Sequence, residues 1–228
     1  NASLNGKSTK GYINDFLYWF PKLNEFKPLA AIFYSGINDS SVYTKSIQIE
    51  NKTFENTFFY KIKSYLVNNS FILNKIKKIK DIYFDLDREK IIYDLNKKNL
   101  YDNFEFLDYE DAKNLYKDIN LTSEEEIKLN YYKRNLEQLK SILIDQNIIP
   151  IFVTQIKYDG LVDKNLYLIN EETKRVAQEN NYYIIKLDEL YIPSVGDFFD
   201  PIHTTPKGSK KMADIIYKKV LLISQELI

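Results

Sequence analysis

The fold follows from the segment Leu29-Ala30-Ala31-Ile32-Phe33-Tyr34-Ser35-Gly36-Ile37-Asn38-Asp39-Ser40. Residues 29–34 form a continuous apolar run of strand length, which is typical of a strand buried on both faces of a parallel sheet. The run ends at Ser35-Gly36, and polar residues follow directly. We therefore predict a buried parallel strand whose carboxyl end leads into a turn that carries Asn38 and Asp39.

Outside this segment, strand patterns alternate with helix patterns. Two more buried strands are predicted at 151–154, directly after Pro150, and at 182–185. Helices are predicted over 12–23, 122–146 and 165–180, and a last helix follows Thr205. This alternation indicates an α/β protein with a three-layer α/β/α architecture around a doubly wound parallel sheet.

Three of the helices carry more detailed expectations. The first should bury one face formed by Ile13, Phe16, Leu17 and Phe20. Thr122 and Glu125 have the spacing of a capping box at the start of the helix 122–146. The last should have Thr205 as N-cap and Pro206 as its first residue. Its inward face should be formed by Met212, Ile216, Val220 and Ile223.

Residues 41–121 interrupt the alternation. They contain aromatic, basic and acidic clusters with helical patterns but without a clear strand, and a connection of this length inside a domain is unusual. We therefore expect residues 1–228 to form a single domain with a mainly helical insertion at about 41–121. The insertion could be a structural elaboration or a lid that covers a substrate.

The composition excludes several classes of function. The chain has 32 basic and 32 acidic residues, so no net field favours nucleic acid as a partner. It has no cysteine and a single histidine, which excludes disulfides, thiolate chemistry and a multi-histidine zinc site. No apolar run approaches the roughly 18 residues of a membrane-spanning helix, so we expect no transmembrane segment.

The single histidine lies in the segment Asp200-Pro201-Ile202-His203, just ahead of the last predicted helix. An acid three residues before a histidine can hold the imidazole in one tautomer while the second ring nitrogen faces a cleft. Asp200 and His203 are therefore candidates for the acid and the base of a nucleophilic hydrolase. The alternative is an ordinary surface or helix-capping histidine.

Three segments taken together resemble the SGNH (GDSL-type) esterase and lipase family. They are Asn1-Ala2-Ser3-Leu4-Asn5-Gly6, Gly36-Ile37-Asn38-Asp39 and Asp200-Pro201-Ile202-His203, in the order of that family's later motif blocks. The resemblance implies a flavodoxin-like sheet and an oxyanion hole formed by the Gly6 amide and the Asn38 side chain. The block with the nucleophilic serine is not present, so we expect that serine upstream of residue 1, on a strand that lies next to the strand 29–34.

The resemblance implies a serine-dependent esterase that acts on an acyl or acetyl ester, for example on a glycan or a lipid, without a cofactor or a metal ion. An acyltransferase of the same fold would use the same site. A catalytically inactive module that binds a glycan or a protein partner is a third possibility. Individually, Gly6 and Asn38-Asp39 could also be ordinary turn residues, and Asp39 is expected to fix its loop through backbone amides rather than to react. The oligomeric state does not follow from the sequence.

Overall fold

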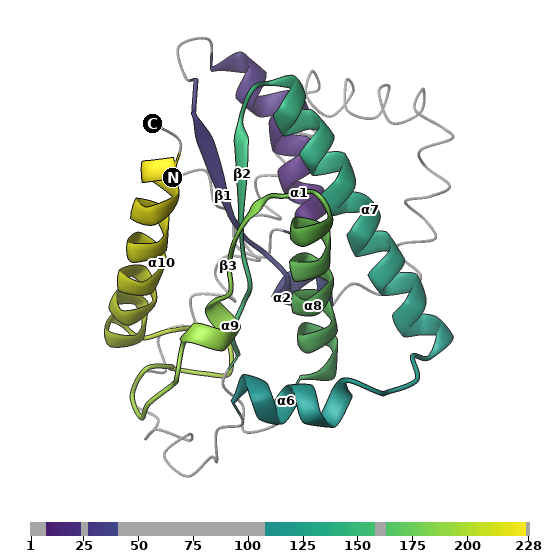
Figure 1. Cartoon of the computed structure of the whole chain (residues 1–228), viewed down its shortest axis with the longest axis vertical. Coiled ribbons are helices and arrows are strands. Elements are labelled where there is room, and N and C mark those ends of the chain that lie inside the picture. The colour runs from purple at the N-terminus through teal and green to yellow at the C-terminus, as the bar shows by residue number, and fades with distance from the viewer. Residues whose placement is uncertain (1–7, 24–26, 41–107, 158–162, 227–228) are drawn as a thin grey trace, which may run out of the picture. The chain divides into compact units, whose positions relative to one another are not determined.

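The computed structural model describes residues 8–23, 27–40, 108–157 and 163–226, all within one compact unit formed by 1–44 and 101–228 (Figure 1). Residues 45–100 form a second unit and lie outside the described residues. The helical insertion expected at 41–121 is therefore described only from residue 108 onward.

Three parallel strands form the sheet of the described region. They are β1 (Ala30–Tyr34), β2 (Ile149–Val153) and β3 (Tyr183–Ile185), in the order β1-β2-β3. Ile32 is paired with Ile151, which in turn is paired with Tyr183. The helix α7 (Ser123–Asp145) connects β1 to β2, and α8 (Lys164–Glu179) connects β2 to β3. The predicted α/β class and the parallel sheet are confirmed.

Helices cover both faces of this sheet. Phe152 of β2 points into a core with Leu136 of α7 and Val176 of α8. Its neighbours Ile151 and Val153 belong to a second core. This second core includes residues of α10 (Pro206–Glu226), which lies on the opposite side of the sheet (Figure 1). Successive side chains of a strand point to opposite faces, so β2 is buried from both sides.

The first predicted helix differs from the observed one. α1 spans Thr9–Asn14 and continues into a π-helical turn, Asp15–Trp19, and a 3₁₀ turn, Phe20–Lys22. Ile13 and Phe16 are buried as expected, but Leu17 is 40% exposed. The wider π turn rotates the residues that follow it, because each residue advances by less than in an α-helix. A strictly α-helical spacing therefore assigned Leu17 to the wrong face.

The capping predictions for the two long helices fit the structure. Thr122 and Glu125 form both halves of a capping box at the start of α7. α10 begins at Pro206. Ile223 is buried in the second core, and Met212, Ile216 and Val220 pack against that core. Both helix starts are set by residues within a few positions of each other, which is why the sequence alone predicts them.

β2 contains a proline, although it is the central strand. The Ile149 amide donates a hydrogen bond to the Leu29 carbonyl, on the side of β1. Pro150 therefore has its backbone groups on the side of β3, where pairing begins only at Ile151. The missing N–H of Pro150 costs no sheet hydrogen bond there.

β1 is less buried than β2. Within the described residues it pairs with β2 alone, and the side chain of Ile32 on β1 is 49% exposed. Leu29, just before the strand, is 68% exposed.

None of the described helices is both long enough and apolar enough to cross a membrane.

Candidate active site

Two of the three predicted site segments, those with Asn38 and with His203, lie at the carboxyl end of the sheet (Figure 1). β1 leads into α2 (Ile37–Ser40), which carries Asn38. β3 leads into α9 (Leu187–Leu190), and α9 contacts α10, whose start follows His203 by three residues. Figure 1 shows α2, α9 and the first turn of α10 at the end of the sheet where the parallel strands terminate. Reactive groups of open α/β sheets gather at this carboxyl edge.

Asp200 and His203 form the contact that their spacing predicts. The Nδ1 atom of His203 lies 2.7 Å from Oδ2 of Asp200. The Oδ1 atom of Asp200 accepts hydrogen bonds from the backbone amides of Ile202 and His203, at 2.9 and 2.8 Å. The His203 side chain is 70% exposed, and its Nε2 atom is on the side of the ring away from Asp200. Asp200 can therefore orient a ring that stays accessible.

The same contacts set the charge of Asp200. Partial burial acts to raise the pKa of its carboxyl group, but the hydrogen bonds from the His203 ring and from the Ile202 and His203 amides outweigh this effect. The pKa of Asp200 lies below its ordinary value as a result. At neutral pH the Asp200 carboxylate is therefore ionised. In a neutral His203 ring it accepts a hydrogen bond from Nδ1–H, and the Nε2 lone pair then points away from Asp200.

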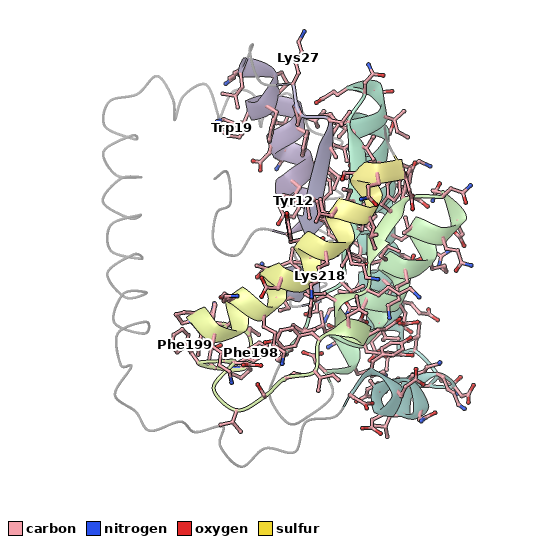
Figure 2. The ribbon with its side chains drawn as sticks, turned by 60° about the vertical axis from the view of Figure 1, so that its left-hand side comes forward. Tyr12, Trp19, Lys27, Phe198, Phe199 and Lys218 are labelled. Atoms are coloured by element: carbon pink, nitrogen blue, oxygen red, sulfur yellow. The ribbon has the colours of Figure 1, made fainter. Side chains whose placement is uncertain are left out.

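Backbone contacts close the loop that carries this pair. Phe198 and Thr204 form an isolated antiparallel bridge, and the Phe199 amide donates a 2.8 Å hydrogen bond to the His203 carbonyl. Phe198 is buried against Tyr191, whereas Phe199 is 50% exposed (Figure 2). The loop thus has a buried base and an accessible tip.

The turn after β1 is held by Gln155, which follows β2. The Gln155 side chain accepts a hydrogen bond from the Ile37 amide and donates one of 3.2 Å to the Tyr34 carbonyl. Gly36 has a φ of +145°, and a Cβ atom there would lie 3.1 Å from Ile169. Glycine is therefore required at this position. Asn38 follows on α2 with an exposed side chain.

Asp39 fixes the turn from the other side. Its buried carboxylate accepts hydrogen bonds from the Thr9 amide at 3.1 and 3.2 Å and from the Thr9 hydroxyl. The predicted role of Asp39 as an acceptor for backbone amides is confirmed. α1 begins at Thr9, and Ser8 at its N-cap makes no side-chain capping bond. Asp39 supplies an acceptor for the start of this helix from another element instead.

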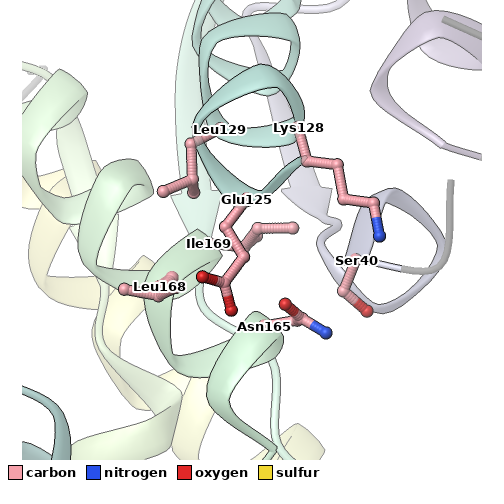
Figure 3. Close-up of a pocket in the computed structure, with 7 residues that line it drawn as sticks. All are labelled: Ser40, Glu125, Lys128, Leu129, Asn165, Leu168 and Ile169. Atoms are coloured by element: carbon pink, nitrogen blue, oxygen red, sulfur yellow. The ribbon is translucent and has the colours of Figure 1, made fainter. Parts of the chain in front are cut away.

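A small open cleft lies beside the turn, between α2, α7 and α8 (Figure 3). It measures about 210 Å³ with its solvent space and is lined by Ser40, Glu125, Lys128, Leu129, Asn165, Leu168 and Ile169. Neither Asn38 nor His203 lines this cleft, so it is not the site that the sequence predicts.

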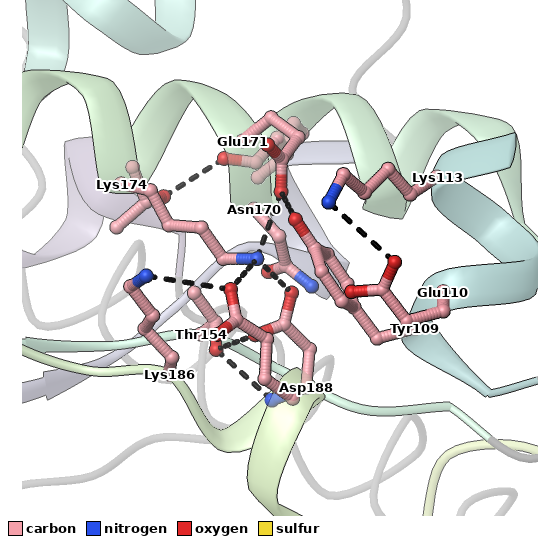
Figure 4. A network of polar contacts seen from close by, with 12 residues as sticks. Tyr109, Glu110, Lys113, Thr154, Asn170, Glu171, Lys174, Lys186 and Asp188 are labelled. Carbon is pink, nitrogen blue, oxygen red and sulfur yellow. Dashed lines mark hydrogen bonds and ion pairs between the residues drawn. The ribbon is translucent and has the colours of Figure 1, made fainter. Parts of the chain in front are cut away.

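A cluster of polar side chains around Lys174 holds α6, α8 and α9 together near the carboxyl end of the sheet (Figure 4). The buried Lys174 of α8 forms ion pairs with Asp188 and Glu189 of α9, at 2.8 and 2.9 Å. Its ammonium group also lies 3.8 Å from the ring centre of Tyr109 on α6 (Tyr109–Tyr116). Burial acts to lower the pKa of Lys174, but the carboxylates, Asp188 above all, raise it above its ordinary value. Lys174 therefore stays charged and ties α6 and α9 to α8.

Three residues that build this end of the sheet, Gln155, Asp197 and Lys174, were not predicted from the sequence. Gln155 and Asp197 bond to several segments that are close only in the folded chain. One feature of the sequence could have pointed to Asp197: its carboxylate lies between Gly196 and Phe198, in a stretch typical of a buried turn. In the sequence, Lys174 is distinguished only by its place in a predicted helix.

Of the predicted site residues, Gly6 lies outside the part of the chain that the structure describes. In the described ranges, no group of three potential ligands is placed to bind a metal ion.

Comparison with known proteins gives no relative: no family model, no curated protein and no solved structure matches the chain.

Proposed function

We propose that this chain belongs to a serine-dependent esterase of the SGNH type that cleaves an acyl or acetyl ester without a cofactor. The observation that carries the proposal is the Asp200–His203 pair. One ring nitrogen of His203 lies 2.7 Å from a carboxylate, and the side chain is 70% exposed at the carboxyl edge. A general base for a serine hydroxyl needs this combination of an oriented ring and an accessible second nitrogen.

The remaining roles follow from the family resemblance. His203 takes the proton of a serine supplied from before Asn1, and Asp200 stabilises the imidazolium that forms. The Asn38 amide, the Gly6 N–H and the amide of the serine itself donate to the oxyanion. The architecture supports this assignment, because α1, α7 and α8 pack on one face and α10 on the other. This distribution suits one half of a doubly wound, flavodoxin-like sheet, in which the proposal expects a further strand beside β1.

The test uses the natural protein with the residues encoded before Asn1. Those residues should end in Gly-Asp-Ser, and a fluorophosphonate probe should label that serine. His203→Ala should abolish labelling, and Asn38→Ala should lower ester turnover by roughly 10²–10³-fold, as the loss of one oxyanion donor does. Another residue in place of the serine, or unchanged turnover in His203→Ala, would contradict the proposal.

Asp214→Asn is the matched control for Asp200→Asn. Asp214 lies on α10, is exposed and forms an i,i+4 ion pair with Lys210 at 3.1 Å. Its replacement should leave labelling and turnover unchanged, whereas Asp200→Asn should lower both. Product analysis with an added acceptor alcohol separates hydrolysis from acyl transfer, because a transferase passes the acyl group to the alcohol rather than to water.

A further inference from the structure

We infer that Asp197 is a positioning residue that holds the Asp200–His203 loop in its reactive orientation, an inference that rests on the proposed function. Its side chain is fully buried, with 0% exposure. The Oδ2 atom accepts hydrogen bonds from the Tyr191 hydroxyl at 3.0 Å and from the amide and hydroxyl of Ser194, both at 2.9 Å. These contacts fix Asp197 to the segment that enters the loop.

The same carboxylate binds the segment that leaves the loop. Lys207 and Lys211, on the first two turns of α10, each place an Nζ atom 3.2 Å from a carboxylate oxygen of Asp197. The Lys207 contact is an ion pair without the alignment of a hydrogen bond. Burial acts to raise the pKa of Asp197, but the Ser194, Lys207 and Tyr191 contacts outweigh it and lower the pKa to about 2. Asp197 is therefore a buried anion between two cations.

The backbone of Asp197 adds a third connection. Its carbonyl accepts a 2.9 Å hydrogen bond from the Thr205 amide. α10 approaches this carbonyl so closely that a Cβ atom on Gly208 would lie 2.0 Å from its oxygen. Glycine at 208 is what permits the approach. The two ends of the loop, at Asp197 and Thr205, are thus joined directly.

The loop between these ends contains both proposed catalytic residues. Asp200 and His203 contact each other inside it, and this contact depends on the shape of the loop. That shape, and with it the orientation of the pair relative to the sheet, depends on the base of the loop, where Asp197 makes its side-chain contacts. Asp197 acts through the loop and is not itself a catalytic residue.

His203 is the only histidine of the chain, so its ring gives a single, assignable set of nitrogen-15 NMR signals. In the neutral ring of His203, the proton should reside on Nδ1, beside Asp200, in one ring conformation. Asp197→Asn removes the charge that holds both lysines, and the ring should then average between tautomers. Unchanged ring signals in a folded Asp197→Asn protein would overturn the inference.

Asp188→Asn is the matched control. Asp188 is also a largely buried carboxylate, with a lysine 2.8 Å away and a hydroxyl group 2.6 Å away, but it lies in the Lys174 cluster. Its replacement should destabilise the fold without changing the ring signals of His203. If both variants shift the signals equally, Asp197 has only a general structural role, which contradicts the inference.

A milder variant covers the case in which Asp197→Asn does not fold. Tyr191→Phe removes one hydrogen bond to Asp197, and Tyr132→Phe, which removes the buried 2.8 Å contact with Thr173, is its control. In the active enzyme, Tyr191→Phe should lower kcat with KM unchanged, because a misplaced base costs turnover rather than binding. An equal loss of kcat in both variants would contradict the inference. The NMR result does not require activity, so it decides on Asp197 even if the esterase proposal fails.

Discussion

The carboxylate of Asp39 accepts hydrogen bonds of 3.1 and 3.2 Å from the amide of Thr9, which lies 30 residues earlier in the chain. Thr9 is the first residue of α1. An anion at a helix N-terminus accepts hydrogen bonds from unpaired amides and interacts favourably with the positive end of the helix dipole. Asp39 directly follows Asn38 in α2. The start of α1 and the turn that presents Asn38 are therefore fixed by one contact.

The burial of Asp39 predicts an unusual dependence of stability on pH. Burial raises the pKa of Asp39 from 3.8 to about 6, although the Thr9 hydrogen bonds act in the opposite direction. The folded state then binds a proton that the unfolded state releases between pH 4 and 6. The free energy of unfolding should therefore fall as the pH rises through this window, by at most about 3 kcal/mol at about 1.4 kcal/mol per pKa unit.

Asp39→Asn should remove this part of the pH dependence, because an amide keeps an acceptor for Thr9 and does not titrate there. Urea unfolding at pH 4, 5 and 6 measures the effect. Asp145→Asn, at the exposed end of α7, should retain the slope of the unmodified chain. A pH dependence between pH 4 and 6 that is the same in all three proteins would show that folding does not raise the pKa of Asp39.

The Gln155 side chain should contribute measurably to stability. Gln155→Leu leaves the Ile37 amide and the Tyr34 carbonyl without their Gln155 contacts, which should cost about 1–3 kcal/mol of unfolding free energy. Gln155→Glu can still accept from Ile37 but cannot donate to Tyr34, so its cost should be intermediate. Gln178→Leu, at an exposed position of α8, should stay within about 0.5 kcal/mol in urea unfolding. Equal stabilities of the Gln155 and Gln178 variants would refute this role.

Local patterns predicted the fold where the controlling residues are close in sequence. The capping box of Thr122 and Glu125 and the Asp200–His203 contact both span three positions, and the structure contains both. The strands 29–34, 151–154 and 182–185 were recognisable as apolar runs, and the observed strands overlap all three.

The sequence did not predict features that depend on distant partners. The start of α1 is fixed by Asp39, 30 residues away in the sequence. Asp197 is held by partners that range from Tyr191 to Lys211. No spacing rule identifies such partners before the chain has folded. The roles of Asn38 and Gly6 at an oxyanion stay predictions.

Gly208→Ala gives a test in which two effects have opposite signs. Inside a helix, replacing glycine by alanine ordinarily stabilises by about 1 kcal/mol. Here the added Cβ would lie 2.0 Å from the Asp197 carbonyl oxygen, so the backbone must shift. We expect a net loss of about 1–3 kcal/mol in urea unfolding, as overpacking causes. Lys210→Ala, exposed on the same helix, is the control and should be nearly neutral. A stabilised Gly208→Ala protein would mean that α10 does not approach Asp197 this closely.

The last prediction concerns the outer edge of β1. Within the described residues, β2 has a strand on each side, whereas β1 and β3 each pair with β2 alone. In hydrogen–deuterium exchange, the amides of residues 151–153 should therefore exchange more slowly than those of 30–34. A longer protein that includes the residues encoded before Asn1 should protect 30–34 further, because the esterase proposal places a strand beside β1.

β3 is the internal control, since it is also an edge strand of this sheet and should gain no protection in the longer protein. Several new backbone hydrogen bonds along β1 should slow exchange there selectively and raise the midpoint of urea unfolding. Equal exchange of 30–34 in the shorter and longer proteins would exclude a strand from this edge. It would also contradict the flavodoxin-like strand order on which the position of the serine depends.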